Sequence, residues 1–184
     1  KILSIKSGDL NKYKLETLKE FLRSDYYVVF GSSFIKGELI DFLIKKRAIN
    51  IHMGVSPFYR GTDCNFWALF DNNPHLVGAT IHLISKDLDN GPILFHAMSK
   101  LKDNPFEYTM STVKSAFHSL VNRIKEKSIM KSKTKTQKSF KKIRISKRID
   151  FNEDAVKKFL EKNIDLDGKE FDKNLLIEPY FLNN

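Results

Sequence analysis

Three polar side chains, an amide, an imidazole and a carboxylate, stand where the sequence predicts strand ends or an adjoining loop. Asn50 and His52 are two residues apart on a short extended segment, so their side chains share one face. Asp89 lies in a turn-rich loop, residues 87–91, directly before a predicted strand. An amide can donate to a developing oxyanion, an imidazole can move a proton, and a carboxylate can orient the imidazole. The three residue types together suit acyl transfer to an amine.

The elements that would position these side chains follow the order of an α/β fold. Residues 26–30 form a β-branched and aromatic run without polar alternation, which is typical of a strand covered on both faces. Leucine and isoleucine then repeat at helical spacing over 39–44, and residues 48–51 predict a second strand. This order indicates a βαβ unit. Ligands bind at the carboxyl ends of parallel strands, which is where Asn50 and His52 would lie.

Further elements complete and cover the predicted sheet. Strands are expected at 2–5, 77–84 and 92–98, and helices at 11–23 and 150–163. Thr62 would cap a short helix that carries Phe66, Trp67 and Phe70. Asn104 and Pro105 signal the start of a long helix, whose apolar stripe comprises Val113, Phe117, Leu120, Val121 and Ile124. We therefore expect an α/β fold, a Rossmann-like and mostly parallel sheet flanked by helices.

Composition excludes several classes of protein. The chain has 184 residues, 41% of them hydrophobic, which suffices for one domain with a real core. The sequence contains no apolar run of 18 residues, so we expect no membrane span, and its single cysteine, Cys64, excludes a disulfide scaffold. Cys64 is interpreted as a packed thiol, and no His, Cys or Asp spacing matches a metal site. A reducing, cytoplasmic setting is expected.

The net charge of +10 is concentrated in one segment. Residues 123–148 hold twelve Lys or Arg and one acidic residue, and the remainder of the chain is nearly neutral. We interpret this segment as a solvated, flexible joint rather than a nucleic-acid contact, because aromatic residues for base stacking are almost absent from it. The predicted organisation is a catalytic domain over 1–125, a basic linker over 126–149 and a short helical extension over 150–184.

Four ordered motifs resemble one enzyme family. They are Asn50-Ile51-His52, Ser56-Pro57-Phe58-Tyr59-Arg60-Gly61, Gly78-Ala79-Thr80-Ile81-His82, and Asp89-Asn90-Gly91-Pro92-Ile93-Leu94. Together they resemble the N10-formyltetrahydrofolate-dependent formyltransferases, and the resemblance covers roughly residues 25–101. It implies attack of a neutral amine on the formyl carbon, with tetrahydrofolate as the leaving group.

The resemblance also implies roles for individual residues. Asn50 would stabilise the oxyanion, His52 would carry the proton, and Asp89 would assist His52. The folate co-substrate, N10-formyltetrahydrofolate, would lie between the segment after the first long strand and the loop before Asp89; the residues implied are Ser33, Phe34, Ile35, Lys86, Asp87, Leu88 and Asn90. Tyr59, Arg60 and Gly61 would meet the acceptor, although Arg60 could equally anchor its loop. His82 is interpreted as a structural or supporting residue rather than a catalyst.

The chain also departs from that family. Only about 25 residues precede the strand at 26–30, so we expect the N-terminal βα units to be missing and one sheet edge to be open. The loop from Met53 to Gly61 resembles that of the sugar N-formyltransferases, which favours a small amine acceptor such as a nucleotide-linked amino sugar. Acceptors of the methionyl-tRNA or glycinamide-ribonucleotide type stay as alternatives, as do a non-catalytic folate-binding remnant, a nucleic-acid module and association into a homodimer.

Overall fold

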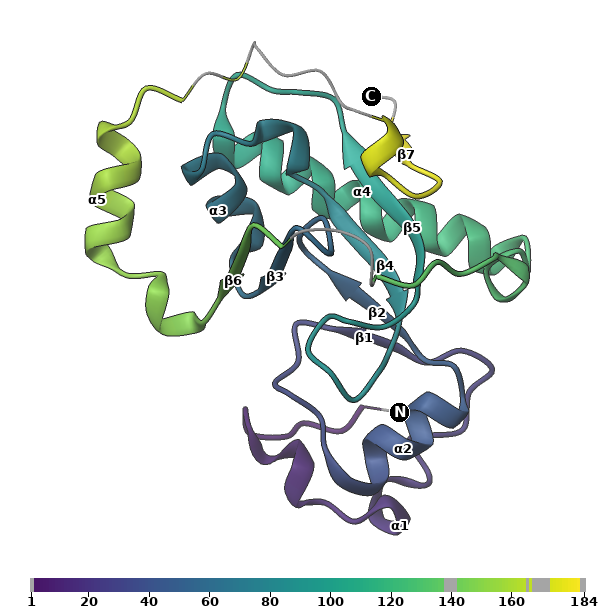
Figure 1. Cartoon of the computed structure of the whole chain (residues 1–184). Coiled ribbons are helices and arrows are strands. Elements are labelled where there is room, and N and C mark those ends of the chain that lie inside the picture. Colours follow the sequence, from purple (N-terminus) through teal and green to yellow (C-terminus); the bar gives the residue numbers. More distant parts are fainter. Residues whose placement is uncertain (1, 138–141, 165, 167–172, 183–184) are drawn as a thin grey trace.

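A five-stranded mixed sheet forms the centre of the molecule (Figure 1). The computed structural model describes residues 2–137, 142–164, 166 and 173–182. The strands follow the order β1 (Val28–Phe30), β2 (Ile49–His52), β4 (Ala79–Leu83), β5 (Ile93–Ser99) and β7 (Tyr180–Leu182). The outer pairs β1/β2 and β5/β7 are parallel, and β2/β4 and β4/β5 are antiparallel. The predicted α/β, Rossmann-like fold is confirmed, with a mixed set of strand directions.

The predicted βαβ unit is present as β1, α2 (Gly37–Lys45) and β2. Leu39, Ile40 and Leu43 are buried along one side of α2, as the helical spacing requires. The helix and the sheet therefore share a small core, with Ala48 at the entry to β2. This packing fixes the start of β2, and with it the positions of Asn50 and His52 near the carboxyl end of that strand.

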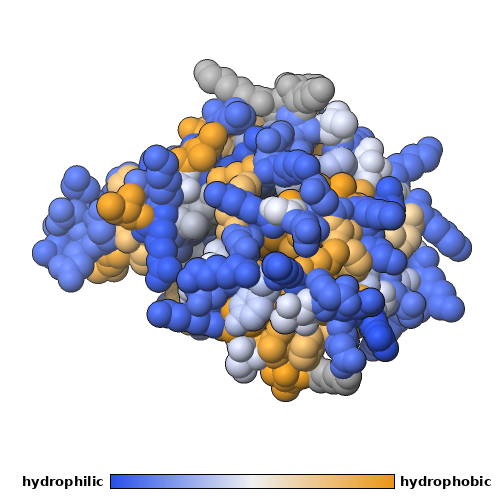
Figure 2. Space-filling model, turned by 90° about the horizontal axis from the view of Figure 1, so that it is seen from below, coloured by the Kyte–Doolittle hydropathy of each residue, from blue (hydrophilic) through white to orange (hydrophobic). Residues whose placement is uncertain are grey.

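Before β1 the chain is less regular than the sequence predicts. The expected strand at 2–5 is absent, and residues 11–23 contain only α1 (Leu15–Leu18) after a 3-10 turn, Asp9–Lys12. Leu18 is nevertheless buried in the core that surrounds α2. The apolar spacing thus identified residues that pack inward, although they do so from short turns. Seen from the side of α1 and α2, hydrophilic residues surround apolar patches (Figure 2).

The long helix α4 (Pro105–Lys125) packs along β4, β5 and β7. Its predicted cap is confirmed, because the Asn104 side chain accepts hydrogen bonds from the backbone N–H groups of Phe106 and Glu107. The predicted apolar stripe is only partly correct, since Phe117 and Val121 are 39% and 44% exposed. The buried residues of this helix are mostly small or hydroxyl-bearing and include Leu120; they are Tyr108, Thr112, Ser115, Ala116, Ser119 and Leu120. Small side chains allow the helix to approach the sheet closely, and a search for large apolar residues misses them.

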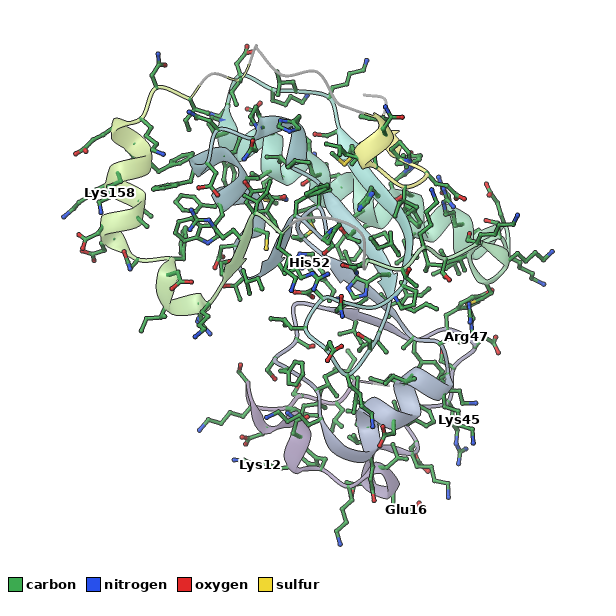
Figure 3. All side chains as sticks on the ribbon, in the orientation of Figure 1. Lys12, Glu16, Lys45, Arg47, His52 and Lys158 are labelled. Carbon is green, nitrogen blue, oxygen red and sulfur yellow. The ribbon has the colours of Figure 1, made fainter. Side chains whose placement is uncertain are left out.

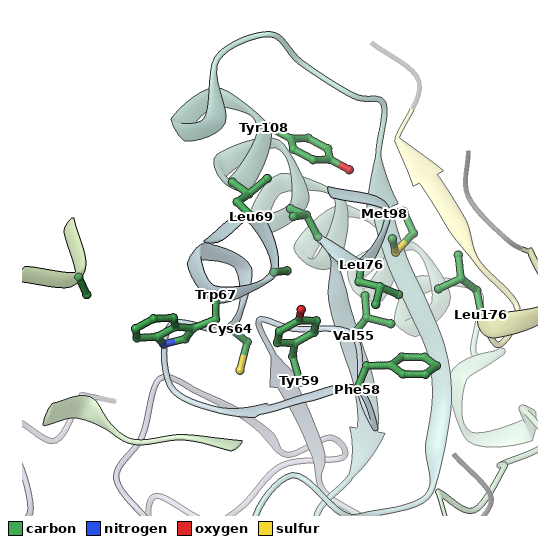
Figure 4. Packing of buried hydrophobic residues seen from close by; sticks show 13 residues of the cluster. Val55, Phe58, Tyr59, Cys64, Trp67, Leu69, Leu76, Met98, Tyr108 and Leu176 are labelled. Carbon is green, nitrogen blue, oxygen red and sulfur yellow. The ribbon is translucent and has the colours of Figure 1, made fainter. Parts of the chain in front are cut away.

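A second sheet pairs two segments that are far apart in the sequence. β3 (Tyr59–Gly61) lies parallel to β6 (Arg144–Ser146). Helix α3 (Cys64–Phe70) follows β3, but its cap residue is Asp63 in a left-handed conformation and not the predicted Thr62. The core beneath α3 includes Tyr59 and Trp67 (Figure 4).

The basic segment is attached to the domain at several places. It contains a 3-10 turn, Ile129–Lys131, and strand β6. Lys135 forms two backbone hydrogen bonds with Ile93 of β5, at 2.8 and 2.9 Å. The segment expected as a flexible linker is therefore attached to the rest of the domain at Lys135 and at β6. Backbone pairing provides this attachment, and a segment rich in Lys, Ser and Thr does not predict such pairing from its composition.

The C-terminal part adds one helix and one strand. Helix α5 (Glu153–Glu161) is capped by Asn152, and Phe159 on this helix packs against Phe66 of α3. Strand β7 joins the main sheet beside β5, which the sequence pattern did not predict. The 3-10 turns Arg148–Asp150 and Lys173–Leu175 lie before α5 and before β7, and a further one, Pro74–Leu76, lies between α3 and β4.

Candidate active site

A cavity of about 680 Å³ opens at the carboxyl ends of β1 and β2. Asn50, His52 and Asp89 all line it, so the structure brings together the three residues singled out from the sequence. Figure 3 shows His52 near the middle of the molecule, between the sheet and the part formed by α1 and α2. The cavity thus lies where the ends of parallel strands are expected to bind ligands.

Both ring nitrogens of His52 face oxygen atoms. Nε2 is 3.0 Å from the carbonyl oxygen of Tyr59, and Nδ1 is 3.4 Å from Oδ2 of Asp89. A carbonyl oxygen can only accept, so Nε2 carries a hydrogen and donates it to Tyr59. Nδ1 is therefore the nitrogen through which His52 can take up and release a proton, and it lies beside the carboxylate of Asp89. This arrangement suits a residue that takes and returns a proton.

Asn50 is oriented by His82. Nδ1 of His82 is 2.8 Å from the carbonyl oxygen of Leu83 and must donate to it, which leaves Nε2 as an acceptor. Nδ2 of Asn50 lies 3.0 Å from that Nε2 and donates one hydrogen to it. Burial lowers the pKa of His82 to about 4, so the ring is neutral at pH 7 and remains able to accept. The second hydrogen of the Asn50 amide is left for a group in the cavity.

Asp89 is held in an unusual backbone conformation. Its φ is 46°, in the left-handed region that a non-glycine residue seldom occupies. Oδ2 of its carboxylate accepts a hydrogen bond from the backbone N–H of Gly61 at 3.0 Å, and the side chain is only 11% exposed. The same loop passes against β4 at Gly91, where a Cβ atom would lie 1.7 Å from the carbonyl oxygen of Leu83. Close packing therefore fixes the loop that carries Asp89.

The predicted folate residues divide into two groups. Five of them line the cavity: Ser33, Phe34, Ile35, Asp87 and Leu88. Phe34 and Leu88 are 46% and 48% exposed, so both present apolar surface to solvent at the site. Lys86 and Asn90 are not among the lining residues. The Nζ atom of Lys86 forms an exposed ion pair with Asp41 at 2.7 Å, and the amide of Asn90 donates to Asp87.

Of the three predicted acceptor residues, only Gly61 lines the cavity. The Tyr59 hydroxyl donates to Asp71 and accepts from Asn73, and burial raises its pKa. The Arg60 guanidinium is also buried and donates to Oε1 of Gln137 at 2.8 Å. This geometry supports the loop-anchor interpretation of Arg60 over direct contact with an acceptor.

Several lining residues were not predicted from the sequence. Ser146, Lys147 and Arg148 reach the cavity because β6 pairs with β3, and Thr62 and Asp63 flank them. No local pattern marks these residues, since the pairing joins positions about 85 residues apart. The lining of the cavity therefore combines apolar residues such as Phe34 with the basic residues Lys147 and Arg148.

The Cys64 thiol and the metal-ligating residue types were the other candidates for chemistry in the sequence. Burial raises the pKa of the Cys64 thiol to about 12, so the thiol stays protonated, as expected of a packed cysteine. Within the described part of the chain, no group of three or more His, Cys, Asp or Glu residues could hold a metal ion. In the same residues, no helix is long and apolar enough to cross a membrane.

Comparison with known proteins gives a consistent family. The model of the formyl transferase family matches residues 6–129. Formyltetrahydrofolate deformylase 2, mitochondrial, of Arabidopsis thaliana is 32% identical over 104 residues, which are 52% of this chain and 30% of that protein. Deformylase 1 of the same plant is 36% identical over 69 residues, 38% of this chain and 19% of its own length. The chain thus spans less than a third of either relative.

Solved structures share the fold. A formyltransferase from Anoxybacillus kamchatkensis, in complex with UDP-4,6-dideoxy-4-formamido-L-AltNAc and tetrahydrofolate, aligns with a TM-score of 0.55 at 24% identity, over 82% of this chain and 72% of that one. A sugar N-formyltransferase from a Shewanella species aligns with a TM-score of 0.59 at 22% identity, over 91% and 68% of the two chains. The family model matches more than half of the chain, residues 6–129, and the chain belongs to the formyl transferase family.

Proposed function

We propose that this protein transfers a formyl group from N10-formyltetrahydrofolate to a primary amine of a small acceptor. The observation that carries the proposal is the juxtaposition of Asn50, His52 and Asp89 in one cavity. Membership of the formyl transferase family supports it, as does the orientation of the Asn50 amide by a neutral His82. These groups supply an oxyanion donor and a proton carrier, which are the two requirements of acyl transfer to an amine.

Each residue has a defined task in this reaction. The acceptor nitrogen forms a bond to the formyl carbon, and the free N–H of Asn50 stabilises the negative charge that develops on the formyl oxygen. His52 takes the proton that the acceptor nitrogen must lose, with Asp89 beside Nδ1. The same proton is returned to N10 of the folate as the bond between that nitrogen and the formyl carbon breaks. Tetrahydrofolate and a formamide are the products.

We infer that folate and acceptor contact different residues of the cavity lining. Phe34 and Leu88 offer apolar surface suited to a flat aromatic ring system. Lys147 and Arg148 also line the cavity and suit an anionic group such as a diphosphate. A nucleotide-linked amino sugar combines an amine with a diphosphate. Its formylated form is bound by the Anoxybacillus relative, which supports this class of acceptor here.

The folate half of the proposal can be tested by calorimetric titration with a reduced folate. Binding at micromolar concentration is expected for the wild-type chain, and Leu88→Asp should weaken it about tenfold because a charge replaces apolar contact. Lys86→Asp changes the same loop but not a cavity-lining residue, and should leave the affinity unchanged. Absence of folate binding by the wild-type chain would refute the proposed function.

A second candidate function is hydrolysis, in which water replaces the amine. The two plant relatives are named formyltetrahydrofolate deformylases, and this favours testing it. Incubation of the chain with formyl-folate, with and without an amino-sugar nucleotide, separates the two reactions. A formamide that appears only with the sugar supports transfer. Formate produced equally in both mixtures would replace transfer with hydrolysis.

A further inference from the structure

We propose that Gln137, in the basic segment behind the catalytic part, is a positioning residue that holds the Asp89 loop in its reactive place. This inference rests on the proposed function for its consequence in turnover, but its geometry can be tested without turnover. The Gln137 side chain is 5% exposed, although lysines and serines dominate the surrounding sequence. A buried amide in such a segment requires partners. The partners of Gln137 are the backbone of the loop that carries Asp89 and the side chain of Arg60.

Every polar atom of the Gln137 side chain is used. Nε2 donates to the carbonyl oxygen of Asp89 at 3.1 Å and to that of Gly91 at 2.7 Å. Oε1 accepts from the Arg60 guanidinium at 2.8 Å. One side chain therefore joins both ends of the loop 89–91 to strand β3. An amide supplies two donors and an acceptor in this arrangement, whereas a carboxylate cannot donate and a thioether cannot donate and accepts only weakly.

The loop requires such support because Asp89 has a positive φ. A non-glycine residue in the left-handed region is strained, and it stays there only where its surroundings fix it. Leu88, the residue before Asp89, is 48% exposed, so its side chain packs only partly against the domain. The contacts that hold the backbone of Asp89 in place then decide where its carboxylate meets His52. Gln137 makes one of these contacts directly, at the carbonyl of Asp89 itself.

Gln137 is itself anchored by the main sheet. Two residues before it, Lys135 exchanges backbone hydrogen bonds with Ile93 at the start of β5. Ile93 follows the loop by two residues, so the segment and the loop are tied to the same strand. On the other side, burial lowers the pKa of Arg60, and the nearby carboxylates of Asp87 and Asp89 oppose that effect. Gln137 accepts one hydrogen bond from this buried cation without adding a charge next to Asp89.

The test uses two substitutions with different predicted contacts. Gln137→Met keeps the length of the side chain and removes all three hydrogen bonds. Gln137→Glu keeps an acceptor for Arg60 but loses both donors to the loop. A matched control is Asn65→Met, because Asn65 is another buried amide with two hydrogen bonds, to Thr112 and Gly78, and it does not line the cavity.

The first readout is amide hydrogen exchange at Gly61, whose N–H donates to Oδ2 of Asp89. Both Gln137 variants should exchange this amide about tenfold faster or more, because the carboxylate is no longer held against it. Asn65→Met should leave it unchanged. The second readout is turnover, where kcat should fall about tenfold while KM for the acceptor stays within about twofold.

Each outcome separates the two proposals. Unchanged exchange at Gly61 in Gln137→Met would overturn the positioning role, whether or not the chain turns over. Wild-type behaviour of Gln137→Glu would also overturn it, since the contact with Arg60 alone would then suffice. If Gln137→Met does not fold, Gln137→Glu supplies the same comparison. A wild-type chain that transfers no formyl group contradicts the proposed function, and the exchange measurement still decides the geometry.

Discussion

The buried histidines should make folding stability depend on pH in a way that one substitution can isolate. His96 on β5 is fully buried, with Nδ1 accepting from the N–H of Ile177 at 2.8 Å and Nε2 donating to the carbonyl of Ser56 at 3.1 Å. Burial lowers its pKa from 6.5 to about 4. A ring with these two partners is neutral in the folded protein.

The direction of the effect follows from the two pKa values. Below pH 6.5 the unfolded chain binds a proton at His96 that the folded protein does not bind until pH is near 4, so stability falls as pH falls. The contribution is complete above pH 6.5 and is lost progressively toward pH 4. At about 1.4 kcal/mol per pH unit, each such histidine removes about 2 kcal/mol between pH 7 and pH 5. His82, with a pKa also lowered to about 4, contributes a similar amount.

The assay is urea unfolding at pH 7 and pH 5, followed by the fluorescence of Trp67, which is the single, buried tryptophan. His96→Gln keeps a donor and an acceptor but cannot titrate. The variant should lose about 2 kcal/mol less stability than the wild type between the two pH values, and carboxylates common to both proteins cancel in this comparison. Equal losses in the two proteins would refute the assignment of a neutral, buried His96.

Three substitutions test the site itself. Asn50→Ala removes the oxyanion donor and should lower kcat by about 100- to 1000-fold with little change in folate affinity; a rate within a few-fold of wild type would contradict this role. Asp89→Asn removes the carboxylate beside His52 and should lower kcat by about 100-fold across the pH profile, whereas an unchanged profile would remove Asp89 from the proton path. Gly91→Ala places a Cβ 1.7 Å from the Leu83 carbonyl and should destabilise the protein by about 2–4 kcal/mol in urea unfolding; wild-type stability would show that the loop can shift.

The sequence predicted the part of the site that is built from short-range order. Strand β2 was predicted by its apolar run, and residues two apart on a strand share a face, so Asn50 and His52 could be paired before the fold was known. Hydrophobic periodicity alone did not identify Asp89 as a site residue. Its loop is turn-rich, but only the resemblance to the formyltransferases connected it to His52, and the structure then placed the two side chains 3.4 Å apart.

The remaining features depend on contacts between distant segments. Gln137 and Lys147 lie in a run whose composition predicts a solvated joint, and their positions follow from backbone pairing at Ile93 and β3. Backbone groups are the same in every residue, so such pairing leaves no local sequence signal. The face of α4 was misplaced for a different reason. The small residues that permit close helix–sheet contact are only weakly hydrophobic, so an apolar pattern does not mark their face as the buried one. The larger Phe117 was therefore expected inside, and it is 39% exposed.

The central claim is that the cavity holding Asn50, His52 and Asp89 moves a formyl group from folate to an amine. The most direct measurement follows a carbon-13 label in the formyl group of N10-formyltetrahydrofolate by NMR, with an amino-sugar nucleotide as acceptor and Asn50→Ala as the control. The wild-type protein should move the label into a formamide on the sugar, at a rate at least about 100-fold above that of Asn50→Ala. A label that stays on the folate, or that moves equally fast in both proteins, would contradict it.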